Sequence, residues 1–170
     1  MLIRPATTEY DEYYGRYIDL VPDGSVLDII EEQIEDTSRL LTTIDEERAG
    51  YRYAPGKWSI RQVVGHILDV ERVFQYRALV FARSDPARLP SMDQDDYVDR
   101  ANFDDRPMVD LCDEYRATRL SGLALFRSFD DGILMRKGFA SDLEFSVRSI
   151  PYILAGHSMH HIEVITGCYL

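Results

Sequence analysis

The 170-residue sequence contains only four histidines, two cysteines and one tryptophan, and it has no long apolar run. Its 19 lysines and arginines are outnumbered by 30 acidic residues, which gives a formal net charge of -11. This charge repels phosphate backbones and anionic lipid, and no basic cluster offsets it locally, so we expect no nucleic-acid partner. No apolar run approaches the roughly 20 residues that span a bilayer, so we expect no membrane segment either.

The two cysteines and the first residues indicate the compartment. Cys112 and Cys168 each lie in an apolar helical pattern, so we expect both to be reduced, buried and unpaired. Residues 1–11 carry acidic side chains where a signal peptide would carry a basic head and an apolar run. Hydrophobic residues make up 45% of the chain, and its length suits one domain over residues 1–170. We therefore expect a single-domain cytoplasmic protein.

Apolar residues recur at helical spacing in the first half of the chain. Ser25 and Asp28 resemble a capping box, which predicts a long helix from there to about Ile44. A shorter helix is predicted before it, at about 9–20. Ser59 and its partner Gln62 form a second capping signature, and the long helix that follows is predicted to run to about residue 82.

The second half of the chain opens with a stretch rich in proline and aspartate, at 83–106, which predicts a long loop with a helical turn inside it. A third long helix is predicted at about 108–129. The last helix starts near Ser149 or near Ser146, because Pro151 fits either the first turn or a kink. Strand evidence is limited to residues 143–147. The predicted fold is all-α, an up-and-down four-helix bundle with a short extra N-terminal helix and a long loop between the second and third main helices.

The histidines occur in two short segments of the predicted bundle. His157 and His161 are four residues apart, so they project side by side from one helix. They take core positions in the apolar stripe of the last helix, and His66 lies on the inward stripe of the second main helix. If these two helices are adjacent, three neutral imidazoles meet in the core and can hold one divalent metal ion. Three nitrogen ligands leave coordination positions open, which is typical of catalytic sites.

Two alternatives remain open at this level. A histidine pair at this spacing also arises by chance, and a single inward histidine such as His66 is more often hydrogen-bonded in a core. His160 follows His157 by three residues and could bind the ion in place of His161. Because His160 lies on the flank of the stripe, we expect it to line a pocket or to support a ligand.

Three segments taken together in chain order carry a resemblance. Residues 58–71 read Trp-Ser-Ile-Arg-Gln-Val-Val-Gly-His-Ile-Leu-Asp-Val-Glu, and residues 155–163 read Ala-Gly-His-Ser-Met-His-His-Ile-Glu. Together with the loop at 89–98, they resemble the DinB superfamily of YfiT-like metalloenzymes. The resemblance covers the chain from the first long helix to the end.

This resemblance implies a metal site, an assembly and an activity. The ligands would be His66, His157 and His161, the metal zinc or nickel, and the assembly a homodimer. Related members transfer low-molecular-weight thiols such as bacillithiol, mycothiol or glutathione, or isomerise a substrate with their help. The implied function is metal-dependent transfer of such a thiol to an electrophilic small molecule.

Two other functions fit the same histidines. The protein could be a metal-dependent hydrolase, or a non-catalytic stress-response protein in which the ion locks the bundle. An apolar pocket that opens on the ion favours an enzyme, whereas a sealed site favours the structural role.

Several other side chains are candidates for the surroundings of the ion. Carboxylates near the histidines could orient the ligands or bind a cation, and aromatic side chains could line the cavity. The carboxylates are those of Asp69, Glu71 and the acidic loop from Asp93 to Asp96, and the aromatic residues are Trp58, Tyr97 and Tyr152.

Overall fold

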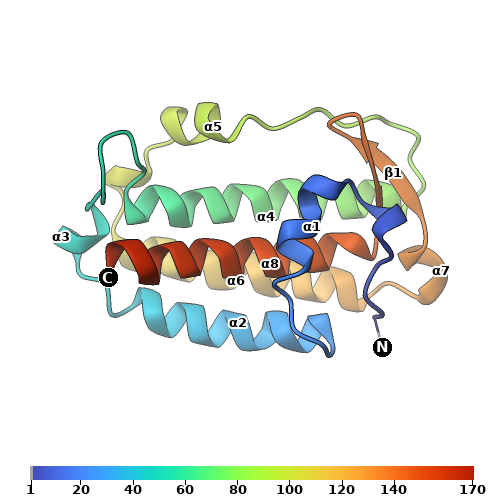
Figure 1. The fold of residues 1–170 in the computed structure, drawn as a ribbon, viewed down its shortest axis with the longest axis horizontal. Helices are drawn as coiled ribbons and strands as arrows, with labels where there is room; N and C mark the ends of the chain where they lie inside the picture. The colour runs from blue at the N-terminus through green and yellow to red at the C-terminus, as the bar shows by residue number, and fades with distance from the viewer. Residues whose placement is uncertain (1) are drawn as a thin grey trace.

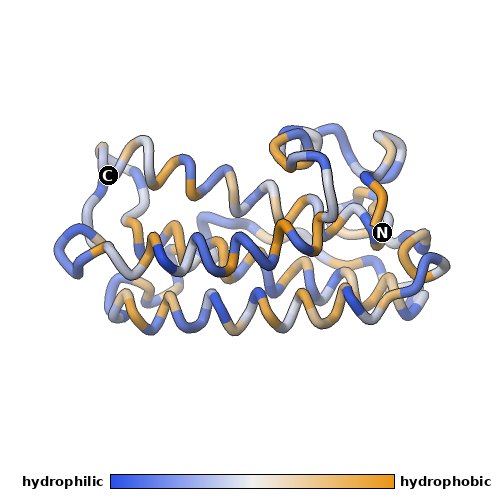
Figure 2. Tube along the Cα trace, turned by 90° about the horizontal axis from the view of Figure 1, so that it is seen from below, coloured by the Kyte–Doolittle hydropathy of each residue, from blue (hydrophilic) through white to orange (hydrophobic). Residues whose placement is uncertain are grey.

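The computed structural model describes residues 2–170, and within this range four long helices lie side by side (Figure 1). Along three of them hydrophobic and hydrophilic residues alternate, so one face of each packs inward (Figure 2), whereas the last is buried on all sides over residues 149–158. The predicted all-α four-helix bundle is confirmed. The four helices are α2 (Val26–Leu41), α4 (Ile60–Ala82), α6 (Met108–Arg127) and α8 (Ser149–Val164).

Shorter elements close the ends of the bundle and cover one side of it. The predicted N-terminal helix is present as α1, and the helical turn expected in the long loop is α5. Pro151 lies in the first turn of α8, where its missing N–H costs no helical hydrogen bond. The short elements are α1 (Glu12–Ile18), α3 (Glu46–Ala49), α5 (Gln94–Arg100), α7 (Asp131–Leu134), the 3-10 turns Thr7–Glu9 and Phe103–Asp105, and the π-helical turn Ile165–Tyr169.

The direction of α6 departs from simple up-and-down alternation. Just before α6, Asp104 accepts a hydrogen bond from Ser59, the N-cap residue of α4. The amide of Met108, at the start of α6, donates to Glu46 Oε1 at 2.9 Å, and Glu46 pairs with Arg61 in the first turn of α4. The long loop therefore returns the chain to the start of α4, so α4 and α6 run in the same direction (Figure 1).

A β-hairpin occupies the connection between α7 and α8. Strands β1 (Lys137–Ala140) and β2 (Leu143–Ser146) pair antiparallel, and β2 lies in the segment 143–147 for which strand structure was expected. The two residues between them, Ser141 and Asp142, both have positive φ values, of 54° and 59°. Such values suit a tight two-residue hairpin turn. Leu89 of the long loop hydrogen-bonds to the hairpin through Phe139 and Ser141, which holds loop and hairpin together.

One expectation about the cysteines is wrong. Cys112 is buried as predicted, but Cys168 is exposed. The chain turns π-helical over Ile165–Tyr169, and the wider turn shifts the apolar stripe that the α-helical spacing had assigned to Cys168. No helix within residues 2–170 combines the length and the apolar character needed to cross a membrane.

Candidate metal centre

The ring nitrogens of three histidines converge between α4 and α8. Nε2 of His157 lies 3.1 Å from Nε2 of His66 and 3.1 Å from Nε2 of His161. All three ligand atoms lie within 4.8 Å of one another. His66 and His157 are 2% and 5% exposed, and His161 is half-buried, so one side of the group remains open.

The separation of these nitrogens fits a shared cation. Nitrogens about 2.0 to 2.1 Å from one ion in tetrahedral geometry lie roughly 3.3 Å apart. Hydrogen bonding explains the arrangement less well, because the single Nε2 position of His157 faces two other ring nitrogens and a neutral imidazole nitrogen either donates or accepts. The donor set therefore fits a divalent ion with three imidazole ligands.

Burial prepares all three imidazoles for a metal. Burial lowers the pKa of His66 to about 4 and is the largest cause that lowers the pKa of His161 to about 3. Charge repulsion from His66 and His160 is the next cause for His161. Burial is also the largest cause that holds the pKa of His157 well below 6.5, and the neighbouring imidazoles add to it. At neutral pH the ligands are uncharged, so they bind a cation without first losing protons.

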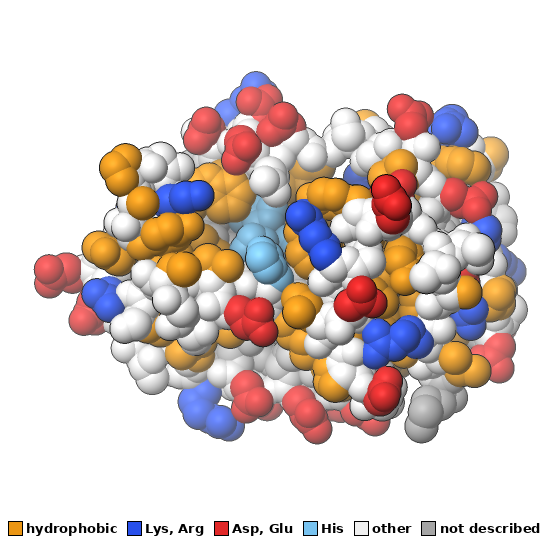
Figure 3. Space-filling model, viewed as in Figure 1, with side chains coloured by type: hydrophobic (Ala, Val, Ile, Leu, Met, Phe, Trp, Pro, Cys, Tyr) orange, Lys and Arg blue, Asp and Glu red, His pale blue; other side chains and the backbone are white. Residues whose placement is uncertain are grey.

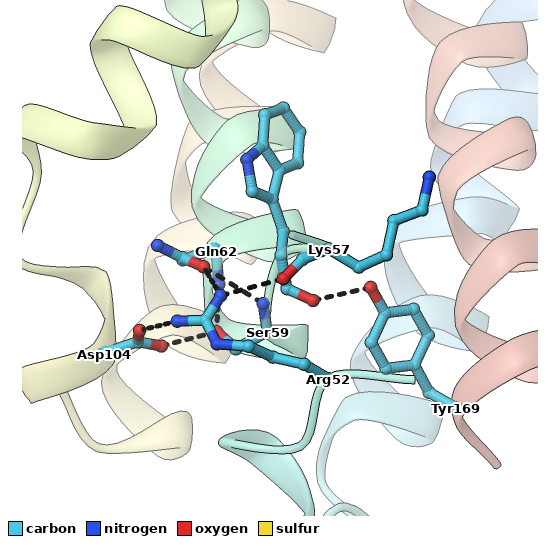
Figure 4. A network of polar contacts seen from close by, with 7 residues as sticks. Arg52, Lys57, Ser59, Gln62, Asp104 and Tyr169 are labelled. Atoms are coloured by element: carbon cyan, nitrogen blue, oxygen red, sulfur yellow. Dashed lines mark hydrogen bonds and ion pairs between the residues drawn. The ribbon is translucent and has the colours of Figure 1, made fainter. Parts of the chain in front are cut away.

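The start of α4 is fixed by a polar network (Figure 4). The predicted capping signature is present, because the Gln62 amide donates to Ser59 Oγ and the Ser59 amide donates to Gln62 Oε1, both at 3.1 Å. Arg52 bonds to Gln62 and, at 2.7 Å, to Asp104. Tyr169 donates its hydroxyl proton to the carbonyl of Trp58 at 2.7 Å. These contacts hold the turn before α4. They place the centre of the Trp58 ring 5.0 Å from the centre of the His66 ring.

Helix α1 covers another part of the histidine group. Gly156 allows its close approach, since a Cβ at this position would lie 1.8 Å from the carbonyl oxygen of Tyr17. The Tyr17 ring then packs edge-on against His157 and His160, at centroid distances of 5.3 and 5.7 Å. The glycine next to His157 therefore lets an aromatic side chain cover the histidine group.

Two pockets reach the histidines from different sides. The first is lined by His66 and His157, with aromatic and apolar residues of α1 and α4. The second is lined by His160 and His161, with Trp58, Lys57 and Asp95 among its other residues. Figure 3 shows histidine side chains at the bottom of a hollow with hydrophobic side chains on both sides. The site is therefore open to small molecules.

A family model described as the DinB superfamily matches residues 29–165, which include all four histidines. The chain belongs to the DinB superfamily. Among curated proteins no sequence matches it. The chain is also similar to the solved structure of YfiT from Bacillus subtilis, with a TM-score of 0.75 and 17% sequence identity over 98% of this chain and 91% of the other. That protein is described as a probable metal-dependent hydrolase with an unusual four-helix bundle topology, and at this identity the likeness shows the fold.

The structure places the other candidate residues of this DinB chain at varying distances from the histidines. Trp58 and His160 line the second pocket, as expected. Tyr152 does not line a cavity at the site, since it is buried and donates its hydroxyl proton to the carbonyl of Leu2 at 3.1 Å. Tyr97 lines a different pocket, beside Tyr76.

The acidic candidates also differ in where they lie and in what they contact. In the acidic loop, Asp93 caps α5 and Asp96 pairs with Arg100, whereas Asp95 lines the second pocket. Asp69 is half-buried on α4, where burial raises the pKa of its carboxyl group. Asp93 and Asp96 therefore stabilise α5, and Asp95 is the residue of the acidic loop that lies at the second pocket.

Glu71 lies behind the histidines, in a buried charged cluster. Its carboxylate pairs with Arg119 of α6, and the two side chains are 3% and 1% exposed. Arg119 also bonds to Gln33 of α2 and, at 3.5 Å, to the carbonyl of Leu154 in α8. Gln33 donates to the carbonyl of Ala155 at 3.1 Å. The cluster thus connects four helices immediately before His157.

Sequence reasoning missed the wall residue Tyr17 and the partner of Glu71. Arg119 did give a signal, because it falls on the apolar stripe of its helix. A charge at such a position is expensive unless it is paired, so it indicates a buried partner. Tyr17 gave no such signal, since an aromatic residue in a short helix usually belongs to the core.

Proposed function

We propose that this protein is a metal-dependent enzyme that transfers a low-molecular-weight thiol to an electrophilic small molecule. The observation that carries the proposal is the pair of pockets that reach the three histidines from different sides. A transfer reaction needs two substrates at one centre, and two pockets provide a place for each. The openings also favour an enzyme over a protein in which the ion only locks the bundle.

In this proposal His66, His157 and His161 hold one divalent ion, and three imidazole nitrogens suit zinc or nickel. A bound ion of this kind lowers the pKa of a coordinated thiol, which supplies a thiolate nucleophile at neutral pH. The low pKa values of the histidines keep them neutral and available as ligands. Trp58 and Tyr17 wall the site on two sides, which limits the access of water to the reacting groups.

The likeness to YfiT supports a second candidate, a metal-dependent hydrolase, because that protein carries this description. The two candidates differ in what they require. The transferase needs a thiol as its second substrate, whereas the hydrolase cleaves an ester or amide with water alone.

The activity test uses metal-loaded protein, one thiol at a time from bacillithiol, mycothiol and glutathione, and a chlorinated nitroarene as electrophile. We expect a metal-dependent rate of thioether formation with one of these thiols, in which the C–S bond replaces the C–Cl bond and chloride and the thiol proton are released. His161→Ala is expected to lower it by at least about a hundredfold, because several kcal/mol of stabilisation by the ion are lost. Product formation is followed by absorbance.

Glu163→Ala serves as the control, because Glu163 is exposed on the same helix two residues further on. It should keep the wild-type rate. Ester cleavage without any thiol would favour the hydrolase, and a wild-type rate in His161→Ala would remove the histidine group from the mechanism.

A further inference from the structure

The structure contains a buried cation that the proposed reaction does not yet use. Arg77 of α4 is 3% exposed. Its Nη2 donates to the carbonyl of Pro90 and to the hydroxyl of Ser141, both at 3.1 Å. Within residues 2–170 no carboxylate lies at ion-pair distance from it. The guanidinium group therefore has neutral neighbours only.

Such a charge is costly to bury. A guanidinium group removed from water is normally compensated by an anion, because uncharged hydrogen-bond partners replace only part of its hydration. Arg119 in the same bundle is also buried, and its charge is compensated in this way by the carboxylate of Glu71. The contrast indicates that Arg77 is kept for an anion that comes from outside the chain.

Arg77 lies on the pocket that leads to the histidines. His66, Val70, Phe74 and Arg77 follow one another at helical spacing along a single face of α4, and all four line the first pocket. Arg77 lies eleven positions after His66, so their Cα atoms are about 16 Å apart along the helix. A ligand that touches both ends of this face must therefore be elongated.

The wall between these two ends is aromatic. Tyr13, Tyr14 and Tyr17 of α1 line the pocket together with Phe74 and Met92. The Tyr14 ring packs edge-on against Phe74, at a centroid distance of 5.8 Å. The Arg77 guanidinium lies 4.6 Å from the centre of the Phe74 ring, which holds the cation in place without neutralising it. The pocket thus combines an apolar body with one positive end.

We infer that this pocket binds an organic acid, with its carboxylate on Arg77 and its apolar body along Phe74 and Val70 toward the histidines. The inference rests on the proposed function and specifies one of its two substrates. Arg77 is the one lysine or arginine among the described residues that line this pocket, so it matches the single charge of a carboxylate, whereas a phosphate dianion would keep one charge unpaired. In a chain of net charge -11, this buried arginine gives an acid a local binding site that the surface does not offer.

The test measures binding of phenylbutyrate and of its neutral analogue phenylbutyramide to the full-length, metal-loaded protein by calorimetry. The acid is expected to bind at least about tenfold more tightly than the amide, since hydrogen bonds to a charged group contribute about 1.5 to 3 kcal/mol. Arg77→Met should abolish this preference, and Arg77→Lys should reduce it, because lysine keeps the charge but loses the planar fork.

Arg88→Met is the matched control. Arg88 follows the same helix and pairs with Asp142 of the hairpin, but its side chain is 60% exposed. It should keep the preference for the acid. If Arg77→Met does not fold, as judged by its melting curve, the inference is tested by comparing the affinities for acid and amide of the wild type and of Arg77→Lys.

Two results would overturn the inference. Equal affinity of the wild type for acid and amide would show that no anion site exists, and undiminished acid binding in Arg77→Met would place the carboxylate elsewhere, for example on the ion. These results are separable from the proposed function. Arg77-dependent acid binding without thiol transfer refutes only the transferase, and thiol transfer with no preference for acids refutes only the acid site.

Discussion

Saturating divalent metal is expected to raise the melting temperature of the metal-free protein by about 8 to 16 °C. An ion at a thousandfold excess over its dissociation constant stabilises the folded state by about 4 kcal/mol, because it binds the folded state alone. For a chain of this size each kcal/mol corresponds to about 2 to 4 °C. His66 and the C-terminal pair lie 91 residues apart in the sequence, so only the folded bundle assembles the site. Differential scanning calorimetry with and without zinc measures the shift.

His157→Ala should lose this shift, and His160→Ala should keep it, because His160 is exposed and His157 lies at the centre of the group. Each variant is compared with itself, with and without metal, so a general loss of stability does not affect the reading. A chelator that removes the ion and leaves the melting curve unchanged would contradict the expectation.

Acid should reverse the effect of the metal, and it should also weaken the metal-free protein. The pKa values of His66 and His161 are lowered by burial to about 4 and about 3 in the folded state, against about 6.5 in the unfolded chain. Between these limits the unfolded state binds more protons, so stability is lost as the pH falls below 6.5 and continues to fall toward 4. In the loaded protein, protons also compete with the ion for the same nitrogens.

Replacing Glu71 with alanine is expected to cost about 3 to 5 kcal/mol of stability. The change leaves the guanidinium of Arg119 buried and unpaired, and a buried charge without its partner is far more costly than the pair. This corresponds to a drop in melting temperature of roughly 6 to 20 °C. Urea denaturation of wild type and variant measures the difference.

The matched control is Glu31→Ala. Glu31 pairs with Arg127 across the same two helices that Arg119 and Gln33 connect, but both side chains are about half exposed. Its loss should cost less than about 1 kcal/mol, as is usual for surface pairs. The double variant Glu71→Leu with Arg119→Met should recover most of the loss, because no charge is left buried. A loss below 1 kcal/mol in Glu71→Ala would show that water reaches Arg119.

Local signals in the sequence predicted much of this fold. The capping signature of Ser59 and Gln62 locates the start of α4, since both of its hydrogen bonds form within four residues. The i, i+4 spacing of His157 and His161 likewise predicted that the two rings lie together. Such features depend on neighbouring residues alone, which is why the helices and the histidine pair could be derived.

Features that depend on distant parts of the chain could not be derived in the same way. The parallel course of α4 and α6 is fixed by contacts such as Ser59 with Asp104, which lie 45 residues apart. The partnership of Arg119 with Glu71 is equally remote in sequence, although the stripe position of Arg119 indicated that some partner exists. The hairpin escaped full prediction because its turn is Ser141–Asp142, which lacks the Asn-Gly signal typical of such turns.

Two single residues have roles or environments that the sequence pattern did not indicate, and each has a local physical cause. The exposure of Cys168 follows from a π-helical turn, whose wider spacing no α-helical pattern describes. Arg77 gave no signal as a ligand-binding residue, because its significance lies in the absence of a carboxylate partner among the described residues. Such a feature is visible only when every neighbour is in place.

The central claim, that His66, His157 and His161 hold one divalent ion, is tested most directly by metal content. Wild type and single alanine variants of the four histidines are loaded with zinc, dialysed against metal-free buffer and examined by elemental analysis. We expect about one ion per chain in the wild type and in His160→Ala, and less than about a tenth of an ion in His66→Ala, His157→Ala and His161→Ala. A full ion retained in His66→Ala, or an equal loss in His160→Ala, would contradict the claim.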